Sequence, residues 1–314
     1  MVYYKVIVEK SDDDISKFQR KFNMKNLTLF INHSLIIFIL SSLFSCKNST
    51  EPISDGGSMI IDHTMTNLSL ISSEKIEKAK GNLHIAYGHT SHGSQLISGM
   101  EGLITFKGSL YSFNNGGSNG NLDLRDRPFS GANDLGNPDR TAWSASTRQY
   151  LDQNSDINVV IWSWCGQVST ATEDDINTYL NLMNQLEEDY PNVTFVYMTG
   201  HLDGSGIDGN LHKHNEQIRK YCRENAKMLY DFADIESYDP DKKTNYMLLN
   251  ADDGCYYDSD GNGSRDANWA IDWQNSHIKD IDWYDCGSAH SQPLNANLKA
   301  YAAWAIWTKI AAKQ

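Results

Sequence analysis

Positive charge, proline and internal repeats are all scarce in this chain. No dense group of Lys and Arg occurs, and the formal net charge is −13. Because binding to phosphate groups requires concentrated positive charge, nucleic acid and an anionic membrane surface are disfavoured as partners. Only six prolines accompany 22 glycines, eight Trp and 16 Tyr, which indicates an ordered globular body. The 314 residues are enough for one large domain or two small ones.

The first 46 residues are predicted to be a targeting segment outside the fold. Residues 1–23 read as an upstream extension, and Met24 is the better translational start. A short basic start, an apolar stretch over 27–44 and small residues before Cys46 then resemble the signal peptide of a bacterial lipoprotein. A transmembrane anchor is the alternative. We therefore expect an exported protein, periplasmic or on the outer surface, which touches the membrane only through a lipid on Cys46, with a tether and lead-in over 47–80.

The remaining cysteines lack the Cys-x-x-Cys spacing of metal thiolate sites. Four of them follow the tether: Cys165, Cys222, Cys255 and Cys286. In an oxidising compartment, an even number of cysteines favours disulfides. Cys255 and Cys286 flank one loop-rich segment and form the first candidate pair, although sequence alone leaves the connectivity open.

Residues 81–314 alternate between apolar runs and helical periodicity. Such alternation predicts one α/β domain, a three-layer α/β/α sandwich with a mostly parallel, flavodoxin-like sheet. The segment 106–148, rich in Gly, Asn, Ser and Asp, reads as a long irregular region, and 240–285 as an insertion rich in Asp and Trp. Strands are expected over 83–88, 158–164, 193–198 and 228–232, and helices over 173–190, 211–226 and 295–312.

The first of these strands ends in Gly88-His89-Thr90-Ser91-His92-Gly93, where a helix begins. Loops at the carboxyl ends of strands meet helix N-termini, which favour developing negative charge. Ser91 is therefore the candidate nucleophile, with a Ser/His-rich surface turn as the alternative. His290, in the turn before the last helix, is the candidate base, and Asp285 the acid that orients it.

These residues resemble, in order and spacing, the motifs of the SGNH (GDSL-type) hydrolases over most of 80–314. Gly88-His89-Thr90-Ser91 takes the place of the Gly-Asp-Ser turn, without its Asp, and His290 takes the place of the final His. The resemblance implies an oxyanion hole formed by Gly116 or Gly117 and by Gln167, which stands where the family has Asn. It also implies a serine esterase that removes acyl groups, chiefly acetyl, from carbohydrate and needs no cofactor for catalysis.

Two other functions stay open. His89, His92 and His201 could converge on one cleft and hold a metal ion, which would give a metal-dependent hydrolase. A glycan-binding surface lipoprotein could instead keep the fold without catalysis. In the esterase these three histidines and Trp164 are expected to contact the substrate.

A calcium loop is predicted within the insertion. Asp258-Ser259-Asp260-Gly261-Asn262-Gly263 matches the first half of such a loop, with Asp258, Asp260 and Asn262 as oxygen ligands and Asp266 at position nine. The twelfth position holds Trp269 in place of the expected Glu. The alternatives are a structural Ca²⁺ and a surface loop rich in Asx turns.

Overall fold

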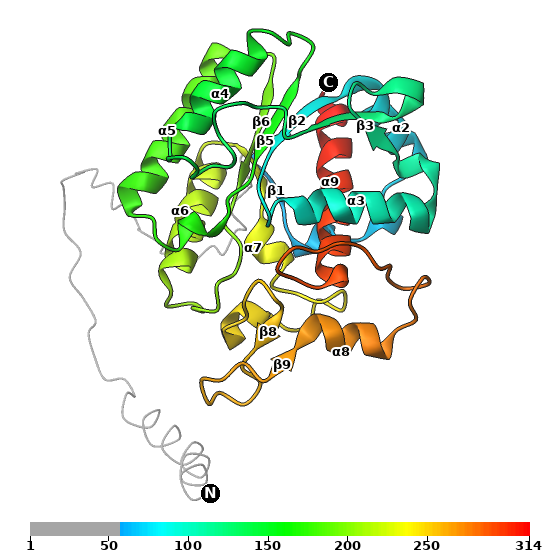
Figure 1. Ribbon diagram of the computed structural model, residues 1–314, viewed down its shortest axis with the longest axis vertical. Helices are drawn as coiled ribbons and strands as arrows, with labels where there is room; N and C mark the ends of the chain where they lie inside the picture. The colour runs from blue at the N-terminus through cyan, green and yellow to red at the C-terminus, as the bar shows by residue number, and fades with distance from the viewer. Residues whose placement is uncertain (1–56) are drawn as a thin grey trace, which may run out of the picture. The chain divides into compact units, whose positions relative to one another are not determined.

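A computed structural model describes residues 57–314 of the chain (Figure 1). Its centre is a sheet of seven strands, all paired in parallel, in the order β1-β7-β6-β5-β2-β4-β3. The predicted signal peptide and the Cys46 lipidation site lie outside the described residues. The strands are β1 (Met59–Ile61), β2 (His84–Gly88), β3 (Phe113–Asn114), β4 (Leu122–Asp126), β5 (Val159–Trp162), β6 (Thr194–Met198) and β7 (Met228–Tyr230).

Helices cover both faces of the sheet, which makes the domain the expected three-layer α/β/α sandwich (Figure 1). One face carries α2 (Ser73–Asn82), α3 (Ser94–Lys107) and α9 (Pro293–Lys313). The other carries α4 (Ala142–Leu151), α5 (Glu173–Asp189) and α6 (Asn210–Glu224). The shorter helices are α7 (Phe232–Ile235) and α8 (Trp269–Ser276), and the 3-10 turns are η1 (His63–Met65), η2 (Leu68–Leu70), η3 (Ser109–Tyr111), η4 (Ser118–Gly120), η5 (Gly166–Val168) and η6 (Tyr246–Leu249).

The strands are apolar on both faces because both faces are covered. In β2, Ile85 and Tyr87 pack against α3 and α9, whereas Ala86 between them packs toward α4 and α5. Successive side chains of a strand point to opposite faces, so a buried parallel strand reads as a continuous apolar run. This is why the runs over 83–88 and 158–164 predict strands correctly.

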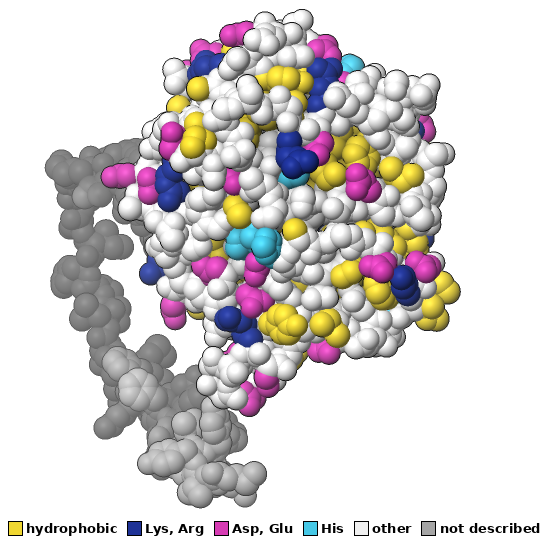
Figure 2. Space-filling view, in the orientation of Figure 1, with side chains coloured by type: hydrophobic (Ala, Val, Ile, Leu, Met, Phe, Trp, Pro, Cys, Tyr) yellow, Lys and Arg dark blue, Asp and Glu magenta, His cyan; other side chains and the backbone are white. Residues whose placement is uncertain are grey.

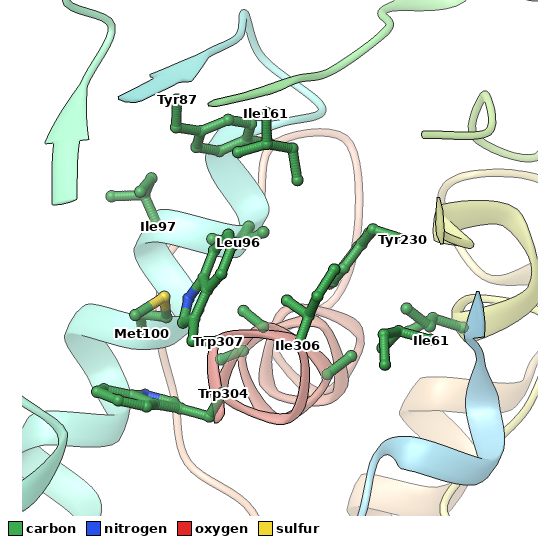
Figure 3. Close-up of a cluster of buried hydrophobic side chains, with 14 of the residues drawn as sticks. Ile61, Tyr87, Leu96, Ile97, Met100, Ile161, Tyr230, Trp304, Ile306 and Trp307 are labelled. Carbon is green, nitrogen blue, oxygen red and sulfur yellow. The ribbon is translucent and has the colours of Figure 1, made fainter. Parts of the chain in front are cut away.

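Helix α9 is the centre of the larger core. Trp304 and Trp307 are fully buried, and Trp307 lies beside Leu96 and Met100 of α3 (Figure 3). The two helices approach so closely at Gly99 that an added β-carbon would lie 2.1 Å from the carbonyl oxygen of Ala296. The sequence of α9 is therefore apolar almost all round, as expected of a buried helix.

The predicted helix over 173–190 is confirmed as α5, and its start is capped as the sequence indicates. The Thr172 side chain accepts from the N–H of Asp175, and the Asp175 carboxylate accepts from the N–H of Thr172. This reciprocal pair is a capping box. The acidic first turn also suits the positive end of the helix dipole.

The structure differs from the sequence prediction in two segments. The lead-in predicted for 47–80 enters the fold at Met59, because β1 pairs with β7 and α2 covers the sheet. The supposedly irregular region 106–148 contains β3, β4 and the start of α4. β3 and β4 are short, and β4 carries Asp and Arg, so the apolar pattern of a buried strand is too weak in this segment to identify them.

The insertion forms a small lobe at the carboxyl end of the sheet. Its two-stranded antiparallel hairpin joins β8 (Tyr256–Tyr257) and β9 (Ala267–Asn268), and α8 follows directly (Figure 1). An isolated bridge between Asp203 and Asp252 ties the lobe to the loop after β6. Over residues 57–314, no helix combines the length and apolar character needed to span a bilayer.

Candidate active site

The candidate site lies between the carboxyl ends of β2 and β5, which are neighbours in the sheet. The chain leaves β2 toward α3 on one face and leaves β5 toward α5 on the other face. Where helices depart to opposite faces, an open α/β sheet has a crevice that commonly binds ligands. The loop over 89–93 and the loop over 163–167 border this crevice.

A thiol, an imidazole and a carboxylate form a hydrogen-bonded chain in this crevice. His92 Nδ1 lies 3.2 Å from Cys165 Sγ, and His92 Nε2 lies 2.8 Å from Asp253 Oδ2. His92 is buried, whereas Cys165 and Asp253 are partly exposed. A nucleophile, a base within hydrogen-bond reach and a third group that orients the base are the components of nucleophilic catalysis.

Within this hydrogen-bonded chain, the pKa of the imidazole is raised and the pKa of the thiol is lowered. Burial alone would lower the pKa of His92, but hydrogen bonds to Asp253 and Cys165 outweigh it and raise that pKa. Burial would likewise raise the pKa of the Cys165 thiol, yet His92 and Ser91 lower it overall. The Asp253 carboxyl has a lowered pKa because the His92 hydrogen bond outweighs its burial. A low thiol pKa is the usual mark of a reactive cysteine.

Ser91 lies beside the thiol, in the turn that precedes α3. Its Oγ is 3.8 Å from Cys165 Sγ. The turn that carries it is compact because a β-carbon at Gly93 would lie 2.3 Å from Ser163 Oγ and 2.4 Å from the β-carbon of His89. The turn that leads into α3 therefore adjoins the thiol through Ser91 and His92.

Three imidazole rings are stacked in the crevice. The His92 ring lies parallel to that of His201, with ring centres 3.6 Å apart, and stacks on His290 at 4.6 Å. His201 is buried, and His290 is exposed. Burial lowers the pKa of His201, so this ring is the neutral neighbour of His92. Histidine side chains and acidic side chains adjoin at the surface in the middle of the face seen in Figure 2.

A buried carboxylate joins the two loops that carry Ser91 and Cys165. Asp134 Oδ2 accepts from Thr90 Oγ1 at 2.7 Å, and Oδ1 accepts from Gln167 Nε2 at 3.1 Å. Gln167 Oε1 in turn accepts from the N–H of Cys165 at 2.9 Å. Because Asp134 is almost inaccessible to solvent, it fixes the separation of the two loops.

A second buried hydrogen-bond network holds the backbone next to His201 and His290. Lys299 of α9 donates to Glu236 Oε2 at 2.7 Å and to the side chain of Gln95, and Glu236 accepts from the N–H of Leu202. Gln95 also donates to the carbonyl oxygen of Ala289 at 2.5 Å. Since Leu202 follows His201 and Ala289 precedes His290, this network anchors both outer rings of the stack.

Ser91, His92, His201 and His290 are therefore brought together, as the sequence indicates, but the expected partners of Ser91 and His290 are not. No hydrogen bond joins the side chains of Ser91 and His290 in the described structure. Asp285 is exposed and pairs with Lys279 at 3.2 Å. The carboxylate near His290 is that of Asp253.

The predicted oxyanion donors are engaged elsewhere. Gly116 N–H donates to Asp123 Oδ1 at 2.7 Å, and Asp123 pairs with His84 at the amino end of β2. Gly116 and its neighbour Gly117 thus lie at the end of the sheet opposite the crevice. Gln167 does lie in the crevice, but its amide N–H₂ donates to Asp134.

Two of the residues predicted to contact substrate make hydrogen bonds within the protein. Trp164 is buried, and its Nε1 donates to the carbonyl oxygen of Met198. His89 is also buried, and its Nε2 lies 2.6 Å from Asp126 Oδ1. His89 borders a separate cavity of about 290 Å³, lined in part by Arg127, Phe129 and Trp162.

Three groups in the described part of the chain bring metal-ligand atoms within 4.8 Å of one another: His92, Asp253 and His290; Asp62, His63 and Asp234; and His84, Asp123 and Asp156. The first group has two imidazoles and a carboxylate, a donor set that suits zinc or iron. It shares His92 and Asp253 with the hydrogen-bonded chain, so the two uses of these atoms exclude one another. Of the predicted His ligands, this group retains only His92.

The predicted calcium loop forms part of the β8–β9 hairpin. The Asp258 carboxylate accepts from the N–H groups of Gly261, Asn262 and Gly263, and Asp266 accepts from Ser259. Asp260 accepts from the N–H of Asn262. These bonds stabilise the loop by themselves, and a bound Ca²⁺ remains a prediction.

The described cysteines are all free thiols. Cys255 Sγ lies 3.4 Å from Ser291 Oγ, and Cys286 Sγ lies 3.8 Å from the carbonyl oxygen of Pro293. The disulfide between Cys255 and Cys286 remains a prediction.

Sequence reasoning missed three residues of the site. Cys165 is one of the four cysteines for which the sequence favours disulfides. Asp253 lies in the insertion over 240–285, and Asp134 lies in the segment 106–148, which the sequence predicts to be irregular. One signal was available for Cys165, because Ser163-Trp164-Cys165-Gly166-Gln167 follows a buried strand as the Ser91 turn does. A comparison with known protein families and with curated proteins finds no match for this chain.

Proposed function

We propose that the protein is a hydrolase of acyl esters in which Cys165 is the nucleophile, His92 the general acid and base, and Asp253 the group that orients His92. The observation that carries this proposal is the chain of hydrogen bonds from Cys165 Sγ through both nitrogens of His92 to Asp253. The lowered pKa of Cys165 and the raised pKa of His92 support it.

The reaction proceeds in two steps. The Cys165 thiolate attacks the ester carbonyl carbon, and a carbon–sulfur bond forms while the His92 imidazolium protonates the departing alcohol oxygen. Water then gives a proton to His92 and attacks the thioester, which releases the carboxylic acid and restores the thiolate. The Ser91 hydroxyl, 3.8 Å from Sγ, stabilises the oxyanion.

The substrate expected from the sequence, an acylated carbohydrate outside the cytoplasm, is part of this proposal. The composition and the resemblance to SGNH hydrolases support it. Lipid anchoring at Cys46 is likewise part of the proposal.

Substitution of the two candidate nucleophiles tests the mechanism. Purified protein lacking residues 1–46 is assayed with p-nitrophenyl acetate and acetylated oligosaccharides. Cys165→Ala is expected to lower kcat/KM by about 10³-fold or more. Ser91→Ala, which removes one oxyanion donor, is expected to lower it by at most about 10²-fold. Circular dichroism and thermal unfolding show whether both variants fold.

A serine esterase with Ser91 as nucleophile is the second candidate, because Ser91 Oγ lies close enough to Sγ for both to reach one carbonyl carbon. This mechanism requires that Ser91→Ala lose more of its kcat/KM than Cys165→Ala does. A metal-dependent hydrolase would lose activity with a chelator such as EDTA and regain it with Zn²⁺. A glycan-binding protein would show no turnover with either nucleophile present.

A further inference from the structure

The Nε2 atom of His201 is the one buried imidazole nitrogen of the stacked rings that lacks a partner within residues 57–314. His201 has 9% of its surface exposed, and its ring is held parallel to His92. A buried polar atom without a hydrogen bond costs free energy, so its retention in a candidate site calls for a ligand.

The other nitrogen of His201 defines what this ligand must offer. His201 Nδ1 lies 2.7 Å from the carbonyl oxygen of Leu202. A carbonyl oxygen can only accept, so Nδ1 carries the proton and Nε2 presents a lone pair. The anchoring of Leu202 by Glu236 keeps the ring in this orientation. The missing partner of Nε2 is therefore a hydrogen-bond donor.

The space beside Gly166, the residue after Cys165, adjoins this buried nitrogen. A β-carbon added to Gly166 would lie 3.9 Å from His201 Nε2. Apart from the residues that flank Gly166, no other heavy atom would lie within 4 Å of it. Gly166 itself is exposed. A substrate whose acyl carbon reaches Cys165 can therefore extend over Gly166 and bring a donor to His201.

We propose that His201 Nε2 accepts a hydrogen bond from a hydroxyl group on the carbon next to the acylated oxygen, so that the substrates are monoesters of vicinal diols, as in partly acylated sugars. The proposal rests on the proposed ester hydrolysis. The leaving oxygen of an ester carries no hydrogen, so the donor is a second group of the substrate, and the adjacent carbon is the nearest position that can carry it. A site with a buried acceptor discriminates strongly against an analogue that lacks the donor.

Two matched substrates test this selectivity: 2-hydroxyethyl acetate and 2-methoxyethyl acetate, which lacks the donor. The wild-type protein is expected to hydrolyse the hydroxyl compound with a kcat/KM about 10- to 100-fold higher. His201→Phe keeps an aromatic ring against His92 but removes the acceptor, so the ratio is expected to fall to about 1. His201→Gln, which restores an acceptor oxygen, is expected to recover part of the preference. A ratio unchanged in His201→Phe overturns the proposal.

A binding measurement separates this proposal from the mechanism. In ¹⁵N-labelled Cys165→Ala protein, 2-hydroxyethyl acetate is expected to shift the Nε2 resonance of His201, and 2-methoxyethyl acetate to leave it unchanged. Such a shift supports the role of His201 even if the wild-type protein turns over neither ester, a result that would overturn only the proposed hydrolysis. Turnover of both esters at equal rates would overturn the role of His201 and leave the hydrolysis standing.

Gly166→Ala provides an independent check, because its methyl group would occupy the space in front of Nε2. It is expected to raise KM for 2-hydroxyethyl acetate several-fold, and an unchanged KM would contradict the proposed position of the substrate.

Discussion

His92 Nδ1 lies 3.2 Å from Cys165 Sγ, although 73 positions separate the two residues in the chain. They meet because β2 and β5 are adjacent and parallel, and because His92 lies four residues after the end of β2 and Cys165 three residues after the end of β5. The pairing places the thiol and the imidazole within hydrogen-bond reach of each other, which lowers the pKa of the thiol and raises that of the imidazole. Four expected outcomes follow for the site and for the helices that support it.

Cys165 should be the first of the four described cysteines to react with iodoacetamide. Its pKa lies below the usual value of 9.0, whereas burial raises the pKa of Cys255 and of Cys286 to about 12. Because only the thiolate reacts, the group with the lowest pKa reacts at the lowest pH. Short pulses of reagent between pH 5 and 9, read by peptide mass spectrometry, measure this order.

His92→Ala is the control for this selectivity. Without the imidazolium, the pKa of Cys165 should rise and its labelling should shift to higher pH. Equal labelling of Cys165 and Cys286 at pH 6 in the wild-type protein would contradict the thiolate–imidazolium pair.

Asp253→Asn should lower kcat by about 10²- to 10⁴-fold, because the imidazole loses the anion that orients it. It should also change the pH profile. The Asp253 hydrogen bond raises the pKa of His92, so its loss lowers that pKa. The imidazolium then deprotonates at lower pH, and the alkaline limb of kcat/KM moves to lower pH.

Asp252→Asn is the matched control for this profile. Asp252 Oδ2 lies 2.9 Å from Arg265 Nε, and its carboxylate also accepts from the N–H of Tyr256, so it takes no part in the chain to Cys165. A similar loss of kcat in both variants would indicate damage to the lobe and not to the chain of hydrogen bonds.

Lys299→Met should destabilise the fold by about 3–5 kcal/mol, because it leaves the Glu236 carboxylate buried without its cation. Combining it with Glu236→Gln should recover a large part of that loss, since both charges are then absent. Urea unfolding of the single and double variants measures the coupling. Lys313→Met, at the exposed end of the same helix, should change stability by less than about 0.5 kcal/mol. Additive effects of the two buried substitutions would argue against the pair.

Gly99→Ala and Gly81→Ala should have opposite effects on stability. A β-carbon at Gly99 would overlap the carbonyl oxygen of Ala296 at 2.1 Å, so α3 and α9 must separate, at a cost of about 1–3 kcal/mol. Gly81 is exposed in α2, with nothing within 4 Å of an added β-carbon, so Ala should stabilise by about 0.5–1 kcal/mol. Thermal unfolding measures both, and a stabilised Gly99→Ala variant would contradict the packing of α3 on α9.

The core strands and the long helices could be predicted because burial on two faces produces continuous apolar runs. The run over 158–164 became β5, and the acidic start of 173–190 became the capped end of α5. The edge strands β1 and β3 could not be predicted, because they have three and two residues and depend on neighbours supplied by distant parts of the chain.

The site could be predicted only in part, because local sequence identifies reactive loops but not the pairing between them. The strand–turn–helix pattern indicates the 88–93 loop, and the structure places Ser91 and His92 of this loop beside Cys165. It could not show that Asp253, from the lobe, would reach His92, since nothing near Asp253 in sequence distinguishes it from Asp252. That choice depends on the turn geometry of the lobe.

The loops after two neighbouring strands bring a hydroxyl and a thiol into the crevice, with 3.8 Å between Ser91 Oγ and Cys165 Sγ. The same sheet and the same stacked rings therefore hold two nucleophilic atoms at one place. The nearest base, His92, and not the fold then distinguishes the two atoms, because it pairs with Cys165.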